Sequence, residues 1–234
     1  MTGATAQPRR DLGYEHVLMP GDGGATLLLL HATGGDEHQL VELGRRLAPG
    51  VTLLSPRGKE LENGVTRRFF RRHSPTELDI PDLLARTDEL ADFIAAAAAA
   101  YGLDAGRVVA LGYSNGANIA ASLLLRRPGT LRGAALLRPM MPYEPDEGLR
   151  LDGASVLIAA GARDPLIPAE QPERLARILA AAGADVAYRV ADAGHELAPS
   201  DLADAAAWLA RLTDERAATG AGDPQAGTPP ADRS

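Results

Sequence analysis

The sequence predicts an α/β fold, with a doubly wound and mostly parallel sheet of about seven strands and helices on both faces. Short apolar segments alternate along the chain with segments of helical periodicity, as in such folds. Near-continuous apolar runs such as Leu27–Leu30 and Val156–Ala160 are typical of parallel strands buried on both faces. The chain has 234 residues, of which 45% are hydrophobic, and this is enough for a continuous core.

Seven segments are predicted to be strands because each is a short apolar run of strand length. They are Glu15–Met19, Thr26–His31, Val51–Ser55, Arg107–Leu111, Gly133–Arg138, Ser155–Ala160 and Val186–Val190. Five segments are predicted to be helices, the first because Leu40, Leu43 and Leu47 recur at helical spacing. They span residues 36–48, 82–102, 115–127, 169–182 and 199–213. No internal repeat or linker divides these elements, so residues 13–214 are predicted to form one domain.

The two ends of the chain are predicted to be solvated tails, at residues 1–12 and 215–234. The C-terminal one is rich in Gly, Pro and Ala and is expected to be disordered. A formal net charge of −7 argues against nucleic-acid binding, and the absence of cysteine excludes disulfides and thiolate catalysis. The N-terminus lacks the apolar core of a secretory signal, and no apolar run is long enough to span a bilayer. We therefore expect a cytoplasmic protein that does not insert into membranes.

The segment Gly112-Tyr113-Ser114-Asn115-Gly116 directly follows the apolar run at 107–111 and precedes a predicted helix. A serine between two glycines at this spacing, entered from a strand and left into a helix, indicates a nucleophile elbow. The serine of such a turn has a strained backbone, and side chains at the flanking positions would collide, so glycines stand there. Ser114 is therefore the candidate nucleophile.

Two further chemical groups follow strand ends, where the functional groups of an open parallel sheet gather. Asp164 follows the predicted strand at 155–160, and His195 follows the one at 186–190. The order Ser, Asp, His along the chain is one in which catalytic triads occur on such sheets. In a triad, His195 would take the proton of Ser114, and Asp164 would hold the imidazole tautomer and stabilise the imidazolium.

The tetrahedral oxyanion formed by a serine nucleophile needs hydrogen-bond donors. One expected donor is the backbone N–H of Asn115, the residue after the nucleophile. The other is the N–H of Thr33, in the segment His31–Gly35 that follows an early strand.

Each assignment has a structural alternative. Ser114 would also suit a helix N-cap, and Asp164-Pro165 would suit a plain turn. Asp185 and Asp192 are rival acids because they lie at the two ends of the last predicted strand, and His195 would also suit a loop without chemistry.

The remaining histidines are assigned structural or surface roles. His31 lies beside the oxyanion loop, but it precedes the nucleophile in the chain, so we expect it to brace that loop by hydrogen bonds. His16, His38 and His73 have no spacing typical of a metal site, so neither a metal nor a cofactor is expected.

With these residues in place, the chain resembles the α/β-hydrolase superfamily, and more narrowly the phospholipase/carboxylesterase group with its small bacterial carboxylesterases and acyl-protein thioesterases. The matching segments are Leu30–Glu37, Gly112–Gly116, Gly161–Pro168, Gly194-His195, Glu62–Gly64 and Arg68–Arg71. The resemblance covers about residues 14–212 and implies an α/β-hydrolase fold. It also implies that Ser114 is the nucleophile, Asp164 the acid, His195 the base, and Thr33 and Asn115 the oxyanion donors.

One position departs from the family pattern. The family usually has glycine after the histidine of the oxyanion loop, where this chain has Ala32. A methyl group there would shift the loop or require a negative φ, which bears on the Thr33 donor.

The substrate pocket is expected at the same end of the sheet as the triad. Candidate lining residues are apolar and follow strand ends; they are Phe69, Phe70, Met140, Met141, Leu166 and Ile167. The run Arg67–Arg72 is the only dense basic segment of this acidic chain. Its arginines would bind an anionic group of a substrate, or form a solvated face with ion pairs to Glu60, Glu62 and Glu77.

The function predicted from these features is hydrolysis of carboxylic esters with short or medium acyl chains through an acyl-enzyme on Ser114. A thioester, or a lactone or ring-cleavage product, would use the same triad, and a basic pocket from Arg68 or Arg71 would favour the latter. A non-catalytic binding protein on the same fold is a third alternative. The expected partner is a small-molecule ester. The resemblance also leaves a homodimer open, although no apolar stripe of the sequence indicates one.

Overall fold

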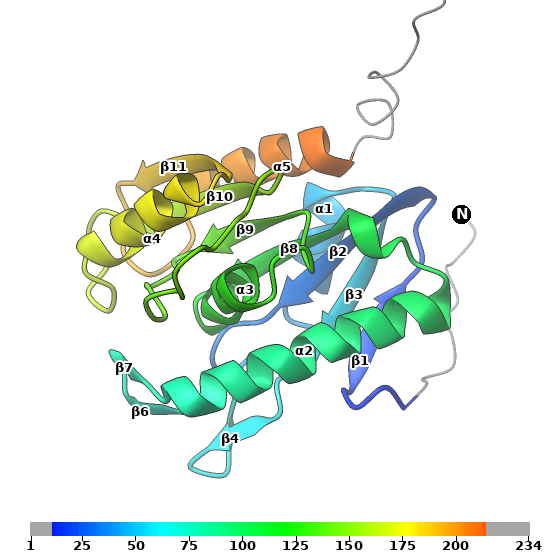
Figure 1. Cartoon of the computed structure of the whole chain (residues 1–234), viewed down its shortest axis with the longest axis horizontal. Coiled ribbons are helices and arrows are strands. Elements are labelled where there is room, and N and C mark those ends of the chain that lie inside the picture. The colour runs from blue at the N-terminus through cyan, green and yellow to red at the C-terminus, as the bar shows by residue number, and fades with distance from the viewer. Residues whose placement is uncertain (1–10, 214–234) are drawn as a thin grey trace, which may run out of the picture.

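The computed structural model describes residues 11–213, and Figure 1 shows them as a central sheet with helices packed on both faces. Within these residues, seven strands form the sheet in the order β1-β3-β2-β8-β9-β10-β11. The strands are β1 His16–Met19, β2 Gly23–Leu30, β3 Val51–Pro56, β8 Val108–Tyr113, β9 Gly133–Leu137, β10 Ser155–Gly161 and β11 Asp185–Ala191. β1 is antiparallel to β3, and the other neighbours in the sheet are parallel. The prediction of a mostly parallel seven-stranded sheet is confirmed.

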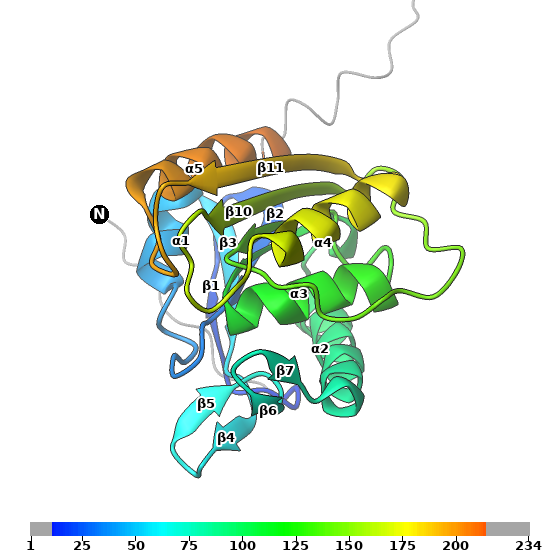
Figure 2. The same cartoon turned by 90° about the vertical axis from the view of Figure 1, so that its left-hand side faces the viewer.

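The helices lie in two layers, one on each face of the sheet. They are α1 Val41–Leu47, α2 Ile80–Tyr101, α3 Asn115–Arg126, α4 Glu170–Ala181 and α5 Pro199–Thr213. α1 and α5 cover one face, and α2, α3 and α4 cover the other (Figure 2). No helix within residues 11–213 is both long enough and apolar enough to cross a membrane.

The strand β2 shows why the sheet needs a helix layer on each face. Its residues Leu27, Leu28, Leu29 and Leu30 are all fully buried, and they alternate between two cores. Leu27 and Leu29 pack on the side of α1 and α5, whereas Leu28 and Leu30 pack on the side of α2, α3 and α4. The continuous apolar run in the sequence therefore reflects burial on both faces.

Two parts of the chain differ from the sequence-based expectation. The first helix begins at Val41 and not at residue 36, because residues 36–40 form turns beside the pocket. The segment after β3, expected to be a loop, contains two hairpins: β4 Glu60–Glu62 with β5 Thr66–Arg68, and β6 Arg72–Ser74 with β7 Glu77–Leu78. Strands of two or three residues are too short to show a period in the sequence.

The predicted tails lie almost entirely outside the described residues. Of the N-terminal one, the structure describes Asp11 and Leu12, and Leu12 packs against the core on the α2 side.

Candidate active site

Ser114 lies in the sharp turn between β8 and α3, with φ 53° and ψ −110°. Such a backbone conformation costs an L-residue about 1–3 kcal/mol, and the surrounding structure must enforce it. A Cβ atom on Gly116 would lie 1.9 Å from the carbonyl oxygen of Leu30, and one on Gly112 would lie 2.5 Å from that of Gly116. Both glycines are therefore required because the turn is packed against β2 and against itself.

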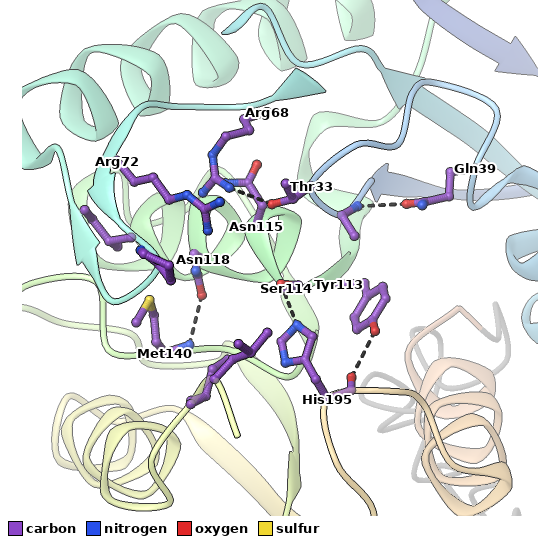
Figure 3. A pocket seen from close by; sticks show the side chains of 15 residues that line it. Thr33, Gln39, Arg68, Arg72, Tyr113, Ser114, Asn115, Asn118, Met140 and His195 are labelled. Carbon is purple, nitrogen blue, oxygen red and sulfur yellow. Dashed lines mark hydrogen bonds between the residues drawn. The ribbon is translucent and has the colours of Figure 1, made fainter. Parts of the chain in front are cut away.

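The side chain of Ser114 makes no helix-capping hydrogen bond. Its Oγ lies 2.9 Å from His195 Nε2 (Figure 3), and His195 Nδ1 lies 2.8 Å from Asp164 Oδ2. A carboxylate only accepts hydrogen bonds, so the Nδ1–H of His195 donates to Asp164 and leaves Nε2 free to accept the serine proton. This chain of hydrogen bonds is the arrangement that activates a serine hydroxyl.

The carboxyl group of Asp164 is buried, with 2% of its side chain exposed. Its Oδ1 accepts the backbone N–H groups of Leu166 at 2.8 Å and Ile167 at 3.1 Å, so the group is fixed in orientation. Among the described residues, the His195 Nδ1 partner is Asp164 and neither rival acid. Asp192 is exposed and pairs with Arg163, and Asp185 is exposed at the start of β11.

Thr33 and Asn115 lie beside Ser114 at the same pocket. Within residues 11–213, neither backbone N–H donates to another residue, so both are free to serve a bound group. The loop that carries Thr33 is tied down on each side of it: the Ala32 N–H donates to Gln39 Oε1 at 2.8 Å, and the Gly34 N–H donates to the Arg67 carbonyl at 2.8 Å.

The alanine at position 32 is compatible with this loop. The positive φ of the segment falls on Gly34, at 82°, and not on Ala32. The methyl group therefore adds no backbone strain at the position where the family usually has glycine.

His31 braces the loop that carries Thr33 by hydrogen bonds, as the sequence indicated. The Gly58 N–H donates to its Nε2 at 2.9 Å, so the ring is neutral there and its Nδ1–H donates to the Ala32 carbonyl at 2.8 Å. The ring is buried and stacks on Phe69 with centroids 4.5 Å apart. Burial lowers the pKa of His31, which favours this neutral form.

A cavity of about 470 Å³ opens above Ser114. Of the predicted lining residues, Met140, Leu166 and Ile167 border it. The prediction was wrong for Phe69 and Phe70, which follow β5 and are fully buried in the core, whereas Arg68 at the end of β5 borders the pocket. Met141 does not border the cavity either and packs against the same core.

Known proteins are similar to this chain in sequence and in structure. Residues 67–213 match the model of the dienelactone hydrolase family. The chain belongs to the dienelactone hydrolase family. It is 45% identical over 194 residues to "Putative hydrolase MhqD" of Bacillus subtilis (strain 168), which covers 83% of this chain and 96% of that protein.

Two solved carboxylesterase structures superpose on this chain over most of its length. A Bacillus cereus carboxylesterase superposes with a TM-score of 0.82 at 41% identity, over 85% of this chain and 94% of that one. A Mesorhizobium loti carboxylesterase superposes with a TM-score of 0.80 at 38% identity, over 88% and 98% of the two chains. The chain is thus an esterase-type hydrolase with the α/β-hydrolase fold, as its resemblance to carboxylesterases predicted, and the non-catalytic alternative is set aside.

The basic run of this family member divides between the pocket and the surface. Arg68 and Arg72 line the cavity, whereas Arg71 is exposed and pairs with Asp79 and Asp82. Arg72 makes a two-point hydrogen bond to Glu62, at 2.7 and 3.0 Å. The run is therefore both a charged face and part of the site, with a different role for each arginine.

Arg68 is 3% exposed and donates to the hydroxyl of Thr33 at 2.7 Å and to the carbonyl of Phe70 at 3.2 Å. No carboxylate of the described residues lies within 4.0 Å of its guanidinium. Burial, followed by the nearby charge of Arg72, lowers the pKa of Arg68 to about 10, and the group stays charged at neutral pH.

Besides Arg72, which belongs to the basic run considered in the sequence, three polar lining residues were not predicted to have a role: Gln39, Tyr113 and Asn118. The side chains of Gln39 and Asn118 accept hydrogen bonds from the backbone. Gln39 Oε1 accepts the Ala32 N–H, and Asn118 Oδ1 accepts the Met140 N–H at 2.9 Å. Tyr113 stacks on the His195 ring with centroids 5.8 Å apart, and Arg72 lies at the pocket wall. The position of Asn118 one helical turn after Ser114 is a signal that could have placed it at the site; the position of Gln39 in the sequence carries no such signal.

Proposed function

We propose that this dienelactone hydrolase family member cleaves carboxylic esters with short or medium acyl chains through an acyl-enzyme on Ser114. One observation carries the proposal. The Oγ of Ser114, the imidazole of His195 and the carboxylate of Asp164 form a continuous chain of hydrogen bonds of 2.9 and 2.8 Å, and Ser114 and His195 border a cavity. The apolar residues Met140, Leu166 and Ile167 line this cavity of about 470 Å³, which suits an acyl group of modest length.

In the first step, Ser114 Oγ attacks the ester carbonyl carbon while its proton passes to His195 Nε2. The carbonyl oxygen becomes an oxyanion that accepts the N–H groups of Thr33 and Asn115, and each donor stabilises the transition state by about 3 kcal/mol. Asp164 stabilises the imidazolium. When the C–O bond breaks, the alcohol leaves with the proton from His195, and the acyl group stays on Ser114.

In the second step, water replaces the alcohol. His195 Nε2 takes a proton from the water as it attacks the acyl carbon, and the same donors bind the second oxyanion. The bond to Ser114 Oγ then breaks, the serine regains its proton, and the carboxylic acid leaves. A thioester substrate would pass through the same steps with a thiol as leaving group.

The proposal is tested with a fluorophosphonate probe and a series of p-nitrophenyl esters of increasing acyl length. Wild type is expected to be labelled and to hydrolyse the shorter esters, and Ser114→Ala to lose both properties. Ser200→Ala, which changes an exposed serine at the start of α5, is the control and keeps them. A folded wild-type protein that neither labels nor turns over any ester would overturn the proposal.

A second candidate is a substrate with an anionic group, such as a carboxylate-bearing ester or lactone. The specific observation in its favour is Arg68, a buried cation at the pocket wall without a carboxylate partner within residues 11–213. A desolvated guanidinium recovers interaction energy when a carboxylate binds to it, since charge-assisted hydrogen bonds are worth about 1.5–3 kcal/mol.

The second candidate is tested with two p-nitrophenyl esters of equal chain length, one with a terminal methyl group and one with a terminal carboxylate. Arg68→Met is expected to raise KM about tenfold or more for the charged ester and to change it little for the neutral one. Arg71→Met, whose arginine lies outside the pocket, serves as control. An equal effect on both esters would show that Arg68 only supports Thr33.

A further inference from the structure

The loop that carries His195 is held by its backbone carbonyl groups. The carbonyls of three consecutive residues each accept a hydrogen bond from a side chain. Arg138 Nε donates to Gly194 at 2.9 Å, Tyr113 Oη donates to His195 at 2.9 Å, and Arg138 Nη2 donates to Glu196 at 2.8 Å. One arginine thus grips the backbone on both sides of the histidine.

Arg138 directly follows β9 and has a positive φ of 55°, and its side chain is fully buried. All three guanidinium nitrogens have partners: Nη1 donates to the Ala159 carbonyl at 3.1 Å, and Nη2 also donates to Asp201 Oδ2 at 2.6 Å. The side chain of Asp201 is 2% exposed, and the same oxygen accepts the Ala198 N–H at 2.7 Å before α5. The ion pair therefore connects β9, the histidine loop and the start of α5.

The residues around this ion pair are packed closely, and Gly161 leaves the space that the histidine loop and the Arg138 guanidinium occupy. A Cβ atom on Gly161 would lie 2.2 Å from the Gly194 carbonyl oxygen and 3.1 Å from Arg138 Nε. Buried ion pairs often contribute little to stability compared with apolar residues of similar volume. A dry ion pair that uses two of its donors on the backbone beside His195 thus points to a role in placing that backbone.

We propose that Arg138 and Asp201 are positioning residues that hold the His195 imidazole between Asp164 and Ser114. This inference rests on the proposed function of the triad. Without the two guanidinium hydrogen bonds, the histidine loop can move by a fraction of an ångström to an ångström while the cavity stays intact. A displacement of this size at a catalytic group costs about 100-fold in rate. The substrate is expected to bind to the apolar lining of the cavity, which this loop movement leaves in place. We therefore expect kcat to fall and KM to stay nearly constant.

The test compares Arg138→Met, Asp201→Leu and the double variant with wild type. Each single variant leaves one buried charge without its partner and is expected to lose stability as well as activity. The double variant leaves no unpaired charge and is expected to regain part of the stability that the single variants lose, yet to keep a kcat about 100-fold lower with KM within about twofold. The surface pair Arg126–Asp88, which joins α3 to α2, gives the matched control Arg126→Met/Asp88→Leu with unchanged kcat.

A second readout does not depend on turnover. The proton between His195 Nδ1 and Asp164 is expected to give a downfield ¹H NMR signal that is present in wild type and the surface control and broadened in the double variant. A stable double variant with wild-type kcat and an unchanged signal would overturn the inference, as would a loss confined to KM. If wild type itself is not labelled by the probe and hydrolyses no ester, the proposed function fails, and the NMR signal still decides whether the pair positions His195.

Discussion

The histidine loop and the oxyanion loop each contact a buried arginine, and the two arginines are used in opposite ways. On the histidine side, Arg138 is enclosed by an ion pair with Asp201 and three backbone carbonyls, so its bonding capacity is filled within the protein. On the oxyanion side, Arg68 borders the cavity, contacts a hydroxyl and a carbonyl, and has no carboxylate partner among residues 11–213. A guanidinium whose nitrogens all have partners within the protein fixes the backbone that it contacts. A guanidinium with no carboxylate partner is available to bind a ligand.

The largest difference is expected in stability. Arg138→Met leaves Asp201 as a buried charge without its cation, and we expect the free energy of unfolding to fall by about 3–5 kcal/mol. Arg68→Met removes two hydrogen bonds to neutral acceptors but also relieves a desolvated charge, so a loss of about 1 kcal/mol is expected. Urea denaturation followed by circular dichroism measures both values. Equal losses would show that the two arginines do not differ in this way.

A smaller effect is expected from Gln39→Leu, which weakens the oxyanion side. This change removes the acceptor of the Ala32 N–H beside Thr33, and we expect kcat for a neutral ester to fall about tenfold, equivalent to about 1.4 kcal/mol. Gln171→Leu removes a similar bond to the Met141 N–H outside the cavity and should leave kcat unchanged. If both variants lower kcat alike, the bond at Ala32 has no special role in the oxyanion loop.

The smallest effect is a pH dependence of stability on the oxyanion side. Because burial lowers the pKa of His31, the unfolded chain binds its proton more readily than the folded protein does. The stability contributed by neutral His31 is therefore complete above about pH 6.5 and is lost as the pH falls below it, by at most about 1.4 kcal/mol per pH unit. His31→Gln keeps an acceptor for the Gly58 N–H and should flatten the dependence between pH 6.5 and 5. The exposed His73 gives the control His73→Gln, which should follow wild type.

The triad residues could be predicted because their signals are local. The two glycines around Ser114 are required by contacts within a few residues and with the adjacent strand, and Asp164 and His195 each follow a strand with a clear apolar pattern. Since parallel strands bring their carboxyl ends to one edge, the order of elements was enough to place these residues together. Whether they catalyse the proposed reaction is for the labelling and kinetic experiments to decide.

The pocket wall could not be predicted in the same way. Phe69 and Phe70 follow a strand end as Met140 does, and nothing in their composition distinguishes a core residue from a lining one. The two short hairpins after β3 decide the matter by turning Arg68 and Arg72 toward the cavity.

The sequence by itself determined the sheet, its two helix layers, and the meeting of Ser114, Asp164 and His195 at one edge of the sheet. These features could be predicted because apolar periodicity and glycine spacing reflect interactions between residues that are close in the chain. Only the tertiary structure decided how those residues are held. Arg138 meets Asp201 across 63 positions of the chain, and Arg68 meets Thr33 across 35. Such pairs leave no period in the sequence, because their energy comes from burial and from partners that become neighbours only when the chain has folded.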